Sequence, residues 1–363
     1  MITTQVILKD AQGDIVDIVN QYYQLEYSIR LDGGIAAFSM ILPKYWQSEF
    51  NSNKKDYRVQ IWRSVNGLPL KLEGKTEFLC TKFSTDDNTV TVTGESIQSL
   101  LKRRIVAYPA GITGLSQFTG FTGNIMKEII RTNFGSSINS SLRDGNELNA
   151  DISQYLTIAS NKGDGVSQSI GCSRQNVFDT ITNLAQSSWE SGQYIVGLIT
   201  SDGTNLVFDT YSNQAGTSKQ IVLSSDTGSA QNFQIERNRT DEITFAVAGG
   251  AGVEQARIIS TAFDRTRINT SVFNRVETFA ENTQIKSQTM LSYLANATVK
   301  ANRGITSISC DIVQNKYVLR GISYDVGDYL PVYFDGTYYV MRLDIVTVSI
   351  SNGQYSERIQ LRI

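Results

Sequence analysis

The side chains that most often carry enzyme chemistry are absent from this chain or scattered along it. The 363 residues contain no histidine. This excludes Ser-His-Asp and Cys-His nucleophilic machinery, histidine-ligated zinc and the usual general base for neutral pH. Cys80, Cys172 and Cys310 lie far apart and are odd in number, which argues against a disulfide framework and a thiolate metal site. We expect them to be buried small apolar side chains.

Three kinds of functional site remain possible: a glycosidase-type carboxylate pair, a calcium site with oxygen ligands, and a Ser-Lys arrangement. The segment from Asp10 to Asp17 places three aspartates around a glycine. It lacks the ligand spacing and terminal Glu of an EF-hand, which favours a plain hairpin turn. Asp144, Glu147 and Asp151 cluster in a polar segment. We interpret them as a solvated acidic patch, since among 35 acidic residues a chance cluster is easily found.

Two further patterns invite a binding function. The glycines from Gly249 to Gly252 lack the Lys-Ser/Thr of a phosphate loop and the glycine order of a dinucleotide turn, so they indicate a close-packed strand crossing or a hinge. The aromatic residues between Tyr329 and Tyr339 could form a glycan platform, but their place in alternating strands favours core and rim positions. We therefore predict no catalytic residue, no cofactor and no metal ligand.

Composition places the chain among ordered globular proteins. Apolar residues make up 40% and charged residues 19%, and this length predicts two to four domains with sizeable cores. The net charge of -2 gives no basic stripe for gripping nucleic acid. No apolar run reaches the roughly 18 residues of a membrane span, and the first residues lack the regions of a signal peptide.

The dominant pattern is a series of short alternating strands joined by tight turns. Asn and Asp, and above all the Gly after them, tolerate the positive φ that such turns need. The predicted turns are Asp32-Gly33, Asn66-Gly67, Asp86 to Asn88, Asp202-Gly203, Asp335-Gly336 and Asn352-Gly353. The last two define a three-strand meander whose middle strand runs from Tyr338 to Ile350. Both ends of the chain therefore predict antiparallel barrels or sandwiches.

Helices interrupt the strands. A short one begins at a Ser96 cap and ends on basic residues. A second begins at a Thr122 cap, and a third at a Ser173 cap. A fourth is predicted over roughly residues 282–302, and its inward side would carry Ile285, Thr289, Tyr293, Leu294 and Ala297.

The segment 90–106, with its strand, glycine, short helix, Leu-Leu and basic end, resembles the first domain of baseplate hub proteins of long-tailed bacteriophages. Further resemblance lies in the small residues 248–252 followed by an acidic and a basic residue, in the segment 274–279, and in the stretch 324–328 before the final strand. These matches spread over about residues 75–363 in the family's order. The matching positions are Gly94, Leu101, Arg103, Arg104, Glu254, Arg257, Gly327 and Asp328.

The resemblance implies a β-rich α+β multidomain fold with two tube-like antiparallel β-barrels, an inserted α/β domain and a linking helical segment. The expected first barrel comprises residues 1–112 plus about 232–250, and the inserted α+β domain comprises residues 113–231. A linking strand and helix segment spans residues 251–302. The second barrel spans residues 303–363.

The resemblance also implies a structural function. The expected protein is a homotrimeric hub at the tip of a phage tail, in the virion, assembled in the cytoplasm of the bacterial host. It would join the hexameric tail-tube ring to a central spike or fibre and provide the channel for the tape-measure protein and the genome. DNA would only pass through, and the chain would not insert into a membrane. Because the chain ends directly after the predicted barrel, we expect the spike to be another polypeptide.

Two other classes stay open from the sequence. A virion-associated glycan or cell-wall hydrolase would need two carboxylates at about 5 to 10 Å in a cleft. A peripheral tail-tip adaptor or receptor-binding subunit would share the β-rich composition but would lie away from the tail axis.

Overall fold

The computed structural model describes residues 2–50, 56–107, 116–135, 152–172, 174–191, 193–212, 216–283, 285–315 and 317–362. Its helices are α1 (Gln47–Phe50), α2 (Thr122–Phe134), α3 (Val177–Glu190), α4 (Arg265–Ile268) and α5 (Gln288–Ala301), with the 3-10 turns η1 (Lys44–Trp46), η2 (Glu73–Lys75), η3 (Ile97–Arg103), η4 (Glu254–Ala256) and η5 (Val272–Asn274). Its strands are β1 (Ile2–Lys9), β2 (Ile15–Val19), β3 (Gln24–Arg30), β4 (Ala37–Pro43), β5 (Arg58–Val65), β6 (Lys71–Leu72), β7 (Phe78–Thr85), β8 (Thr89–Ser96), β9 (Ser116–Phe121), β10 (Leu156–Ile158), β11 (Ser167–Cys172), β12 (Ile195–Ser201), β13 (Leu206–Ser212), β14 (Ala230–Asn238), β15 (Phe245–Gly249), β16 (Ile259–Phe263), β17 (Glu277–Glu281), β18 (Ile305–Ile312), β19 (Tyr329–Phe334), β20 (Thr337–Ser351) and β21 (Gln354–Arg362).

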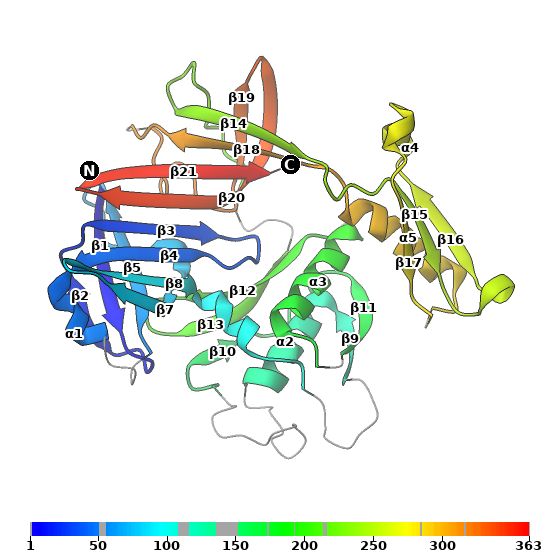
Figure 1. The fold of residues 1–363 in the computed structure, drawn as a ribbon, viewed down its shortest axis with the longest axis horizontal. Coiled ribbons are helices and arrows are strands. Elements are labelled where there is room, and N and C mark those ends of the chain that lie inside the picture. Colours follow the sequence, from blue (N-terminus) through cyan, green and yellow to red (C-terminus); the bar gives the residue numbers. More distant parts are fainter. Residues whose placement is uncertain are drawn as a thin grey trace.

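One large sheet unites the two ends of the chain. Its order is β14-β18-β21-β20-β3-β4-β8-β7-β5-β1-β2, with β19 paired to β20 and β6 to β5. The N-terminal and C-terminal strands join where β3 pairs with β20, with Tyr27 opposite Val348. In the described residues the sheet stays open, with β14 and β2 as its two edges (Figure 1). The β-rich fold is therefore confirmed, but the two separate closed barrels that we expected are not found.

Turn chemistry produces the C-terminal meander. Asp335 and Gly336 both have positive φ, at 49° and 72°, and Asn352 and Gly353 follow the same pattern at 50° and 75°. Two successive positive φ values match the right-handed twist of the flanking strands, so each pair closes a tight hairpin. The predicted meander of β19, β20 and β21 is confirmed.

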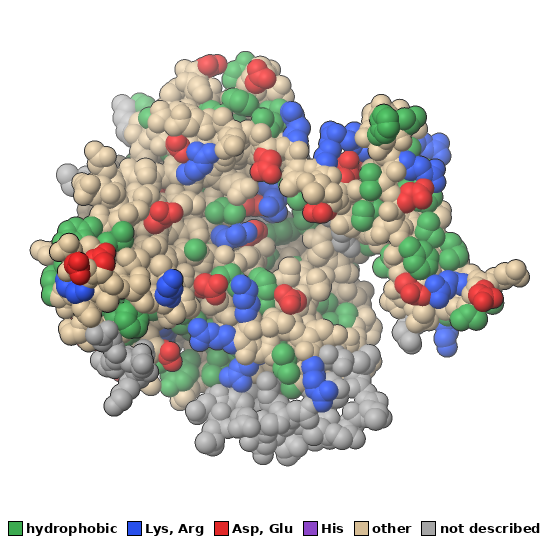
Figure 2. Space-filling view, viewed as in Figure 1, with side chains coloured by type: hydrophobic (Ala, Val, Ile, Leu, Met, Phe, Trp, Pro, Cys, Tyr) green, Lys and Arg blue, Asp and Glu red, His purple; other side chains and the backbone are tan. Residues whose placement is uncertain are grey.

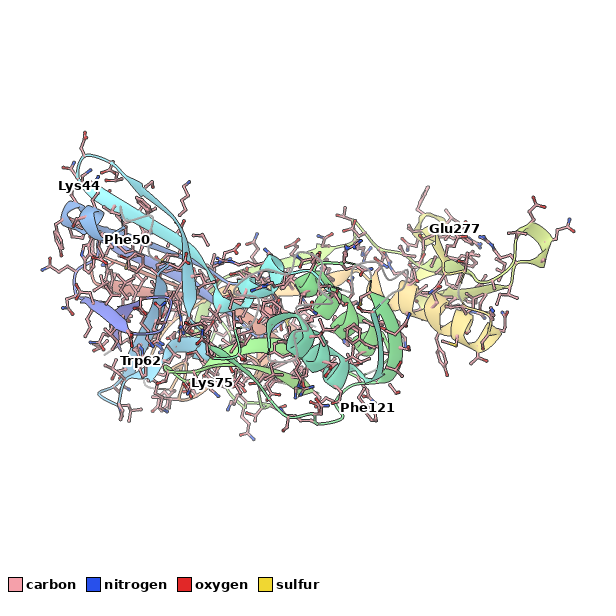
Figure 3. The ribbon with its side chains drawn as sticks, turned by 90° about the horizontal axis from the view of Figure 1, so that it is seen from below. Lys44, Phe50, Trp62, Lys75, Phe121 and Glu277 are labelled. Carbon is pink, nitrogen blue, oxygen red and sulfur yellow. The ribbon has the colours of Figure 1, made fainter. Side chains whose placement is uncertain are left out.

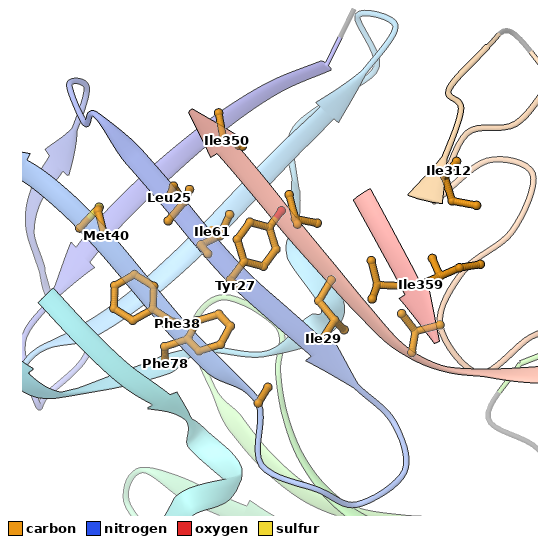
Figure 4. Packing of buried hydrophobic residues seen from close by; sticks show 14 of the residues in the cluster. Leu25, Tyr27, Ile29, Phe38, Met40, Ile61, Phe78, Ile312, Ile350 and Ile359 are labelled. Carbon is orange, nitrogen blue, oxygen red and sulfur yellow. The ribbon is translucent and has the colours of Figure 1, made fainter. Parts of the chain in front are cut away.

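The main core lies between strands of this sheet that curl over one another. The inward side chains of β3 and β4 face those of β1 and β5, and Tyr27, Phe38 and Phe78 lie at the centre (Figure 4). The Tyr27 and Phe78 rings meet edge to face, with centroids 6.4 Å apart. Burial of one such large side chain stabilises the fold by roughly 1.5–3 kcal/mol.

A second module lies between β8 and β14 in the sequence. Helices α2 and α3 pack with the β10-β13-β12 and β11-β9 sheets around their own apolar cluster. Helix α2 begins at Thr122, but Thr122 does not cap it as predicted: Phe121 occupies the N-cap position without a side-chain cap bond, and the Thr122 hydroxyl donates to the Val166 carbonyl at 2.9 Å instead. The cap of α3 differs, because the side chain of Asn176 accepts a hydrogen bond from the backbone N–H of Phe178, while Ser173 lies outside the described residues. Ser96 also makes no cap bond at η3; its hydroxyl accepts from the backbone N–H of Ala36 instead.

A third module projects from the body as an arm (Figure 1). Its sheet has the order β16-β15-β17, and α5 covers one face. Helix α5 begins at Gln288, later than predicted, and its buried stripe is Leu291, Ala295 and Val299. Tyr293, which we expected on the inward side, is 70% exposed. The inward stripe follows the i, i+4 spacing that begins at Leu291, and it packs against the alanines of β15 and β16.

The segment 232–250 does not complete the N-terminal group of strands as expected. Strand β14 pairs with β18 at the far edge of the large sheet, whereas β15 pairs with β16 and β17 in the arm. The alternation of the two strands was visible in the sequence, but alternation identifies a strand without identifying its partner.

Candidate functional site

The predicted motif at residues 94–104 connects the large sheet to the second module. A Cβ atom at Gly94 would overlap the carbonyl oxygen of Leu79 on the neighbouring strand. Leu101 is fully buried in the core of the second module. Arg104 lies over the Phe134 ring at 5.5 Å, and its carbonyl accepts a hydrogen bond from Val177 at 3.0 Å. Arg103 is exposed, so the two arginines differ in environment.

Replacing Gly94 with Ala should destabilise the protein by about 3 kcal/mol, at the upper end of overpacking effects, because the overlapping atom belongs to backbone rather than to a flexible side chain. Thr91→Ala, on the partly open face of the same strand, should change stability by less than about 0.5 kcal/mol. Urea unfolding followed by tryptophan fluorescence measures both. Equal midpoints for the two variants would show that the strands can separate enough to admit a methyl group.

The matching residues of the arm do not pair with each other. A terminal nitrogen of Arg257 lies 2.6 Å from a carboxylate oxygen of Glu281, and its guanidinium lies 5.9 Å from the centre of the Phe279 ring. Glu254 is exposed, with φ of 48°. The small residues before them allow close packing, because a Cβ at Gly250 would come within 2.7 Å of the Ile285 carbonyl oxygen.

Gly327 and Asp328 fasten the final meander to the end of the second module. Gly327 has φ of +91°, which lets the chain turn into β19. The buried Asp328 carboxylate accepts hydrogen bonds from the backbone N–H groups of Thr217 at 2.6 Å and Asp325 at 2.8 Å. The Lys219 ammonium lies 3.5 Å away. This motif thus organises a junction and leaves Asp328 no free oxygen for catalysis.

A polar row crosses the outer face of the large sheet. Direct strand pairing aligns Ser356, Ser349, Glu26, Ser39, Thr93 and Lys82 on β21, β20, β3, β4, β8 and β7. Four of the six carry hydroxyls, while alternate residues such as Val348 and Phe38 point into the core. Figure 2 shows neutral surface with scattered charges over these strands. The row spans the join between the two ends of the chain.

Charges beside this row are largely paired. Arg358 on β21 lies 2.8 Å from Asp311 on β18, and Arg30 at the end of β3 lies 2.7 Å from Asp32. A depression of about 260 Å³ over β14, β18, β21 and β20 is lined mainly by Ser, Thr, Gln and Glu side chains. The face therefore offers hydroxyl and amide groups without a continuous basic strip of the kind that binds phosphates.

A buried ionic cluster, missed from the sequence, lies under this sheet. Arg320, from the segment before β19, is fully buried and contacts Glu73 at 2.6 Å and Glu357 at 2.9 Å. Arg63 on β5 also pairs with Glu73 and donates to the Arg320 carbonyl at 3.0 Å. Three tyrosines complete the set by donating to the carboxylates: Tyr27, Tyr324 and Tyr355. The two positive charges of the arginines balance the two negative charges of the glutamates. The Arg320–Glu73 pair joins residues that are 247 positions apart in the sequence.

The sequence held a partial signal for this cluster. Glu357 alternates with Ile359 and Leu361 on the buried side of β21, and Arg63 alternates with Val59 and Ile61 on β5. A charge within an apolar stripe requires a partner. Nothing in the sequence indicated which partner it would be.

Burial and neighbouring charges shift the pKa values of this cluster in different directions. Burial opposes ionisation of Glu73, but the positive charges of Arg320 and Arg63 more than offset it, so the pKa of Glu73 lies below its usual value. Burial raises the pKa of Tyr27, with the charge of Glu73 adding to the effect. The same holds for Tyr324 beside Glu357. Burial also raises the pKa of Tyr355.

The tyrosines predict alkaline sensitivity. A phenol whose pKa is raised in the fold contributes stability that is complete below its unfolded value, near 10, and is lost as the pH rises through the folded value. We expect the melting temperature to fall steeply above about pH 10, with the buried phenols ionising only as the protein unfolds. Absorbance at the tyrosinate band, followed beside circular dichroism, measures this. Reversible ionisation of all 17 tyrosines in a still-folded protein would contradict the assignment.

A second buried pair anchors the second module. Glu77 pairs with Arg58 at 2.6 Å and accepts from Gln60 and from Ser201 on β12. Lys9 donates to the Gly203 carbonyl at 2.8 Å in the turn after β12. The β12–β13 hairpin is thereby fixed to β1 and β5.

A cavity of about 380 Å³ lies where the large sheet, the β12–β13 hairpin and the segment before β19 meet. Glu73, Asp325 and Asp328 line it, but Glu73 is engaged by two arginines and Asp328 by backbone N–H groups. No group of three potential metal ligands occurs among the described residues, and the acidic segment 144–151 lies outside them. In the described chain no helix is long and apolar enough to cross a membrane.

Known proteins share this fold. The 43 kDa tail protein of prophage MuSo2 from Shewanella oneidensis has a TM-score of 0.61 and 11% identity, over 99% of this chain and 98% of that one. The tail protein from Neisseria meningitidis MC58 has a TM-score of 0.59 and 11% identity, over 99% and 96%. A chain of the lidded Francisella PdpA-VgrG complex has a TM-score of 0.56 and 9% identity, over 100% of this chain and 53% of that one.

At these identities the likeness shows the fold alone. No match was found among curated proteins. The profile of the siphovirus ReqiPepy6 Gp37-like protein family, however, matches residues 75–363, which is the stretch over which the sequence resembles phage hub proteins. That resemblance is confirmed at the level of a phage tail family. The chain therefore belongs to the siphovirus ReqiPepy6 Gp37-like protein family and has the fold of phage tail proteins.

Proposed function

We propose that this protein is a homotrimeric hub at the tip of a phage tail, with the polar row of the large sheet facing a central channel. The observation that carries the proposal is the register of Ser356, Ser349, Ser39 and Thr93 across strands from both ends of the chain. A surface along which DNA and an extended protein must slide needs hydration without strong attachment. Neutral hydroxyls supply this, because phosphate affinity comes mainly from Lys and Arg.

Symmetry supports the same function. Along the sheet, β7-β8-β4-β3 is followed directly by β20-β21-β18-β14, so one chain presents two consecutive groups of four antiparallel strands. Three copies present six groups, which matches a hexameric tube ring above while keeping threefold symmetry for a spike or fibre below. Closed rings of this kind are built from heterologous contacts. The tape-measure protein, the distal tail ring and the spike or fibre are the partners that this position implies.

Multi-angle light scattering of the purified protein at increasing concentration tests the proposal. We expect a trimer, and class averages from electron microscopy should show an axial hole wide enough for duplex DNA, about 20 Å. A stable dimer, or a ring whose hole is lined by the arm rather than by the large sheet, would overturn it. Antibody labelling of intact tails separates an axial hub from a peripheral adaptor.

We predict no hydrolysis of peptidoglycan or polysaccharide by the purified protein. The carboxylates Glu73 and Asp328 in the 380 Å³ cavity are already engaged, so they cannot serve as the free acid and base of a glycosidase. A zymogram on cell wall should show no cleared zone. A cleared zone that Asp325→Asn abolishes, Asp325 being the remaining acidic side chain lining that cavity, would favour the hydrolase instead.

A further inference from the structure

The arm carries exposed apolar and cationic side chains at one end of its sheet. Phe245 and Phe263 stack at 6.1 Å on the face opposite α5. Arg275 lies over the Phe245 ring at 4.3 Å and Arg265 over the Phe263 ring at 5.4 Å. In the 3-10 turn η5, at the same end, Phe273 is 89% exposed. We name this surface the arm tip, and define it by Phe245, Phe263, Arg265, Val272, Phe273 and Arg275.

Figure 2 shows hydrophobic side chains flanked by Lys and Arg at this end of the arm. Val272 and Phe273 are the most exposed large apolar residues of the described chain. Arg265 pairs with no acidic side chain among the described residues. Exposed aromatics next to an unneutralised cation are typical of a binding surface for an apolar, acidic partner.

The large sheet offers a complementary surface at its open edge. Ile15 on the edge strand β2 is 63% exposed, and Ile18 on the same strand is 36% exposed. Asp14 and Asp17 are exposed beside them, and in the described residues no basic side chain lies within ion-pair distance of either. An apolar edge strand with unpaired backbone groups promotes aggregation unless something covers it. This acidic, apolar strand is the kind of partner that the arm tip fits.

We propose that the arm tip of one copy docks on strand β2 of the next copy, and that repetition of this contact closes the ring. The inference deepens the proposed function and rests on its homo-oligomer. Arg265 would face Asp14 or Asp17, while Phe273 and Ile15 would be buried against each other. The two surfaces lie at opposite ends of the molecule (Figure 1). Figure 3 agrees, with Glu277 of the arm at one end and Phe50 near the other. Surfaces placed in this way form a heterologous contact.

Charge reversal tests the contact. We expect Arg265→Glu and Asp17→Arg each to weaken self-association about tenfold, which is the effect of losing about 1.4 kcal/mol. The double variant Arg265→Glu with Asp17→Arg should return to within about threefold of the unmodified protein, because the opposite charges are restored with exchanged signs. Arg303→Glu makes the same charge change at another exposed position and should leave self-association unchanged. Sedimentation velocity gives the association constants, and circular dichroism checks the fold.

Cross-linking gives a second readout. A chain carrying Phe273→Cys and Ile15→Cys should form intermolecular disulfides under mild oxidation, whereas either substitution alone should not. If a trimer forms but neither charge reversal weakens it and the cysteines do not join, the inference is overturned while the proposed hub stands. If the unmodified protein stays monomeric at every concentration, both fall. A different protein docking on the arm tip would leave self-association unchanged, and that outcome also overturns the inference.

Discussion

Glu73→Ala should lower the free energy of unfolding by about 3–5 kcal/mol, the effect of removing one partner from a buried ion pair. The substitution removes the carboxylate that pairs with Arg63 and leaves the buried Arg320 with Glu357 alone. The Arg320 side chain is fully buried, so water cannot replace the lost partner without opening the join between the two ends of the chain. Urea unfolding of the purified protein measures the change.

A matched control is available on the surface. Glu277 pairs with Arg275 at 2.5 Å, but both side chains are more than half exposed, so Glu277→Ala should cost less than about 1 kcal/mol. Acid provides a further check. The pKa of Glu73 is lowered in the fold by Arg320 and Arg63 against the effect of burial, so its stabilising contribution is present above about pH 4.3 and is lost as the pH falls through the folded value. Glu73→Gln should remove that pH dependence. Equal losses for Glu73→Ala and Glu277→Ala would show that the cluster is hydrated.

Local structure was predictable wherever one short segment determined it. The meander from Tyr329 to Arg362 follows from two turns with successive positive φ values, and α2 follows from an apolar stripe of ordinary spacing. The caps were harder: the Ser96 hydroxyl bonds to Ala36, 60 positions away, and at α3 the local cap is Asn176, three residues beyond the predicted Ser173. The inward face of α5 was misplaced, since the stripe of Leu291, Ala295 and Val299 and the predicted stripe through Tyr293 have the same helical spacing, and only packing against the sheet decides between them.

Strand partners were not predictable in the same way. Residues 1–112 and 303–363 were predicted as parts of two barrels because each stretch has its own hairpins, yet they merge where β3 pairs with β20. The merging contact joins residues more than 300 positions apart, and no local pattern encodes it. The buried cluster has the same origin: Arg320 and Glu73 become neighbours only through that join. The family resemblance identified the positions of Gly94 and Asp328 but said nothing of this cluster.

The channel hypothesis predicts a gain of DNA binding with a topological signature. Ser39→Lys, Thr93→Lys and Ser349→Lys together place three lysines along the polar row of each chain, and hence nine in a trimer. If about six of them neutralise phosphates, linear duplex DNA should bind with an affinity that falls roughly 10³-fold between 50 and 200 mM salt. The unmodified ring should bind weakly, because its row is neutral apart from Glu26 and Lys82.

A comparison of linear with circular DNA shows whether the polar row lines a channel or lies on an outer surface. A closed ring admits the end of a linear duplex but not a covalently closed circle, so the triple variant should retain linear DNA and release circular DNA of the same length. A control with Ser48→Lys, Thr204→Lys and Asn296→Lys carries the same added charge at exposed positions away from the row, and it should bind both forms alike. Filter retention at several salt concentrations compares the two. Equal binding of circular and linear DNA by the row variant would place the row on the outside, and the hub would then need another surface for its channel.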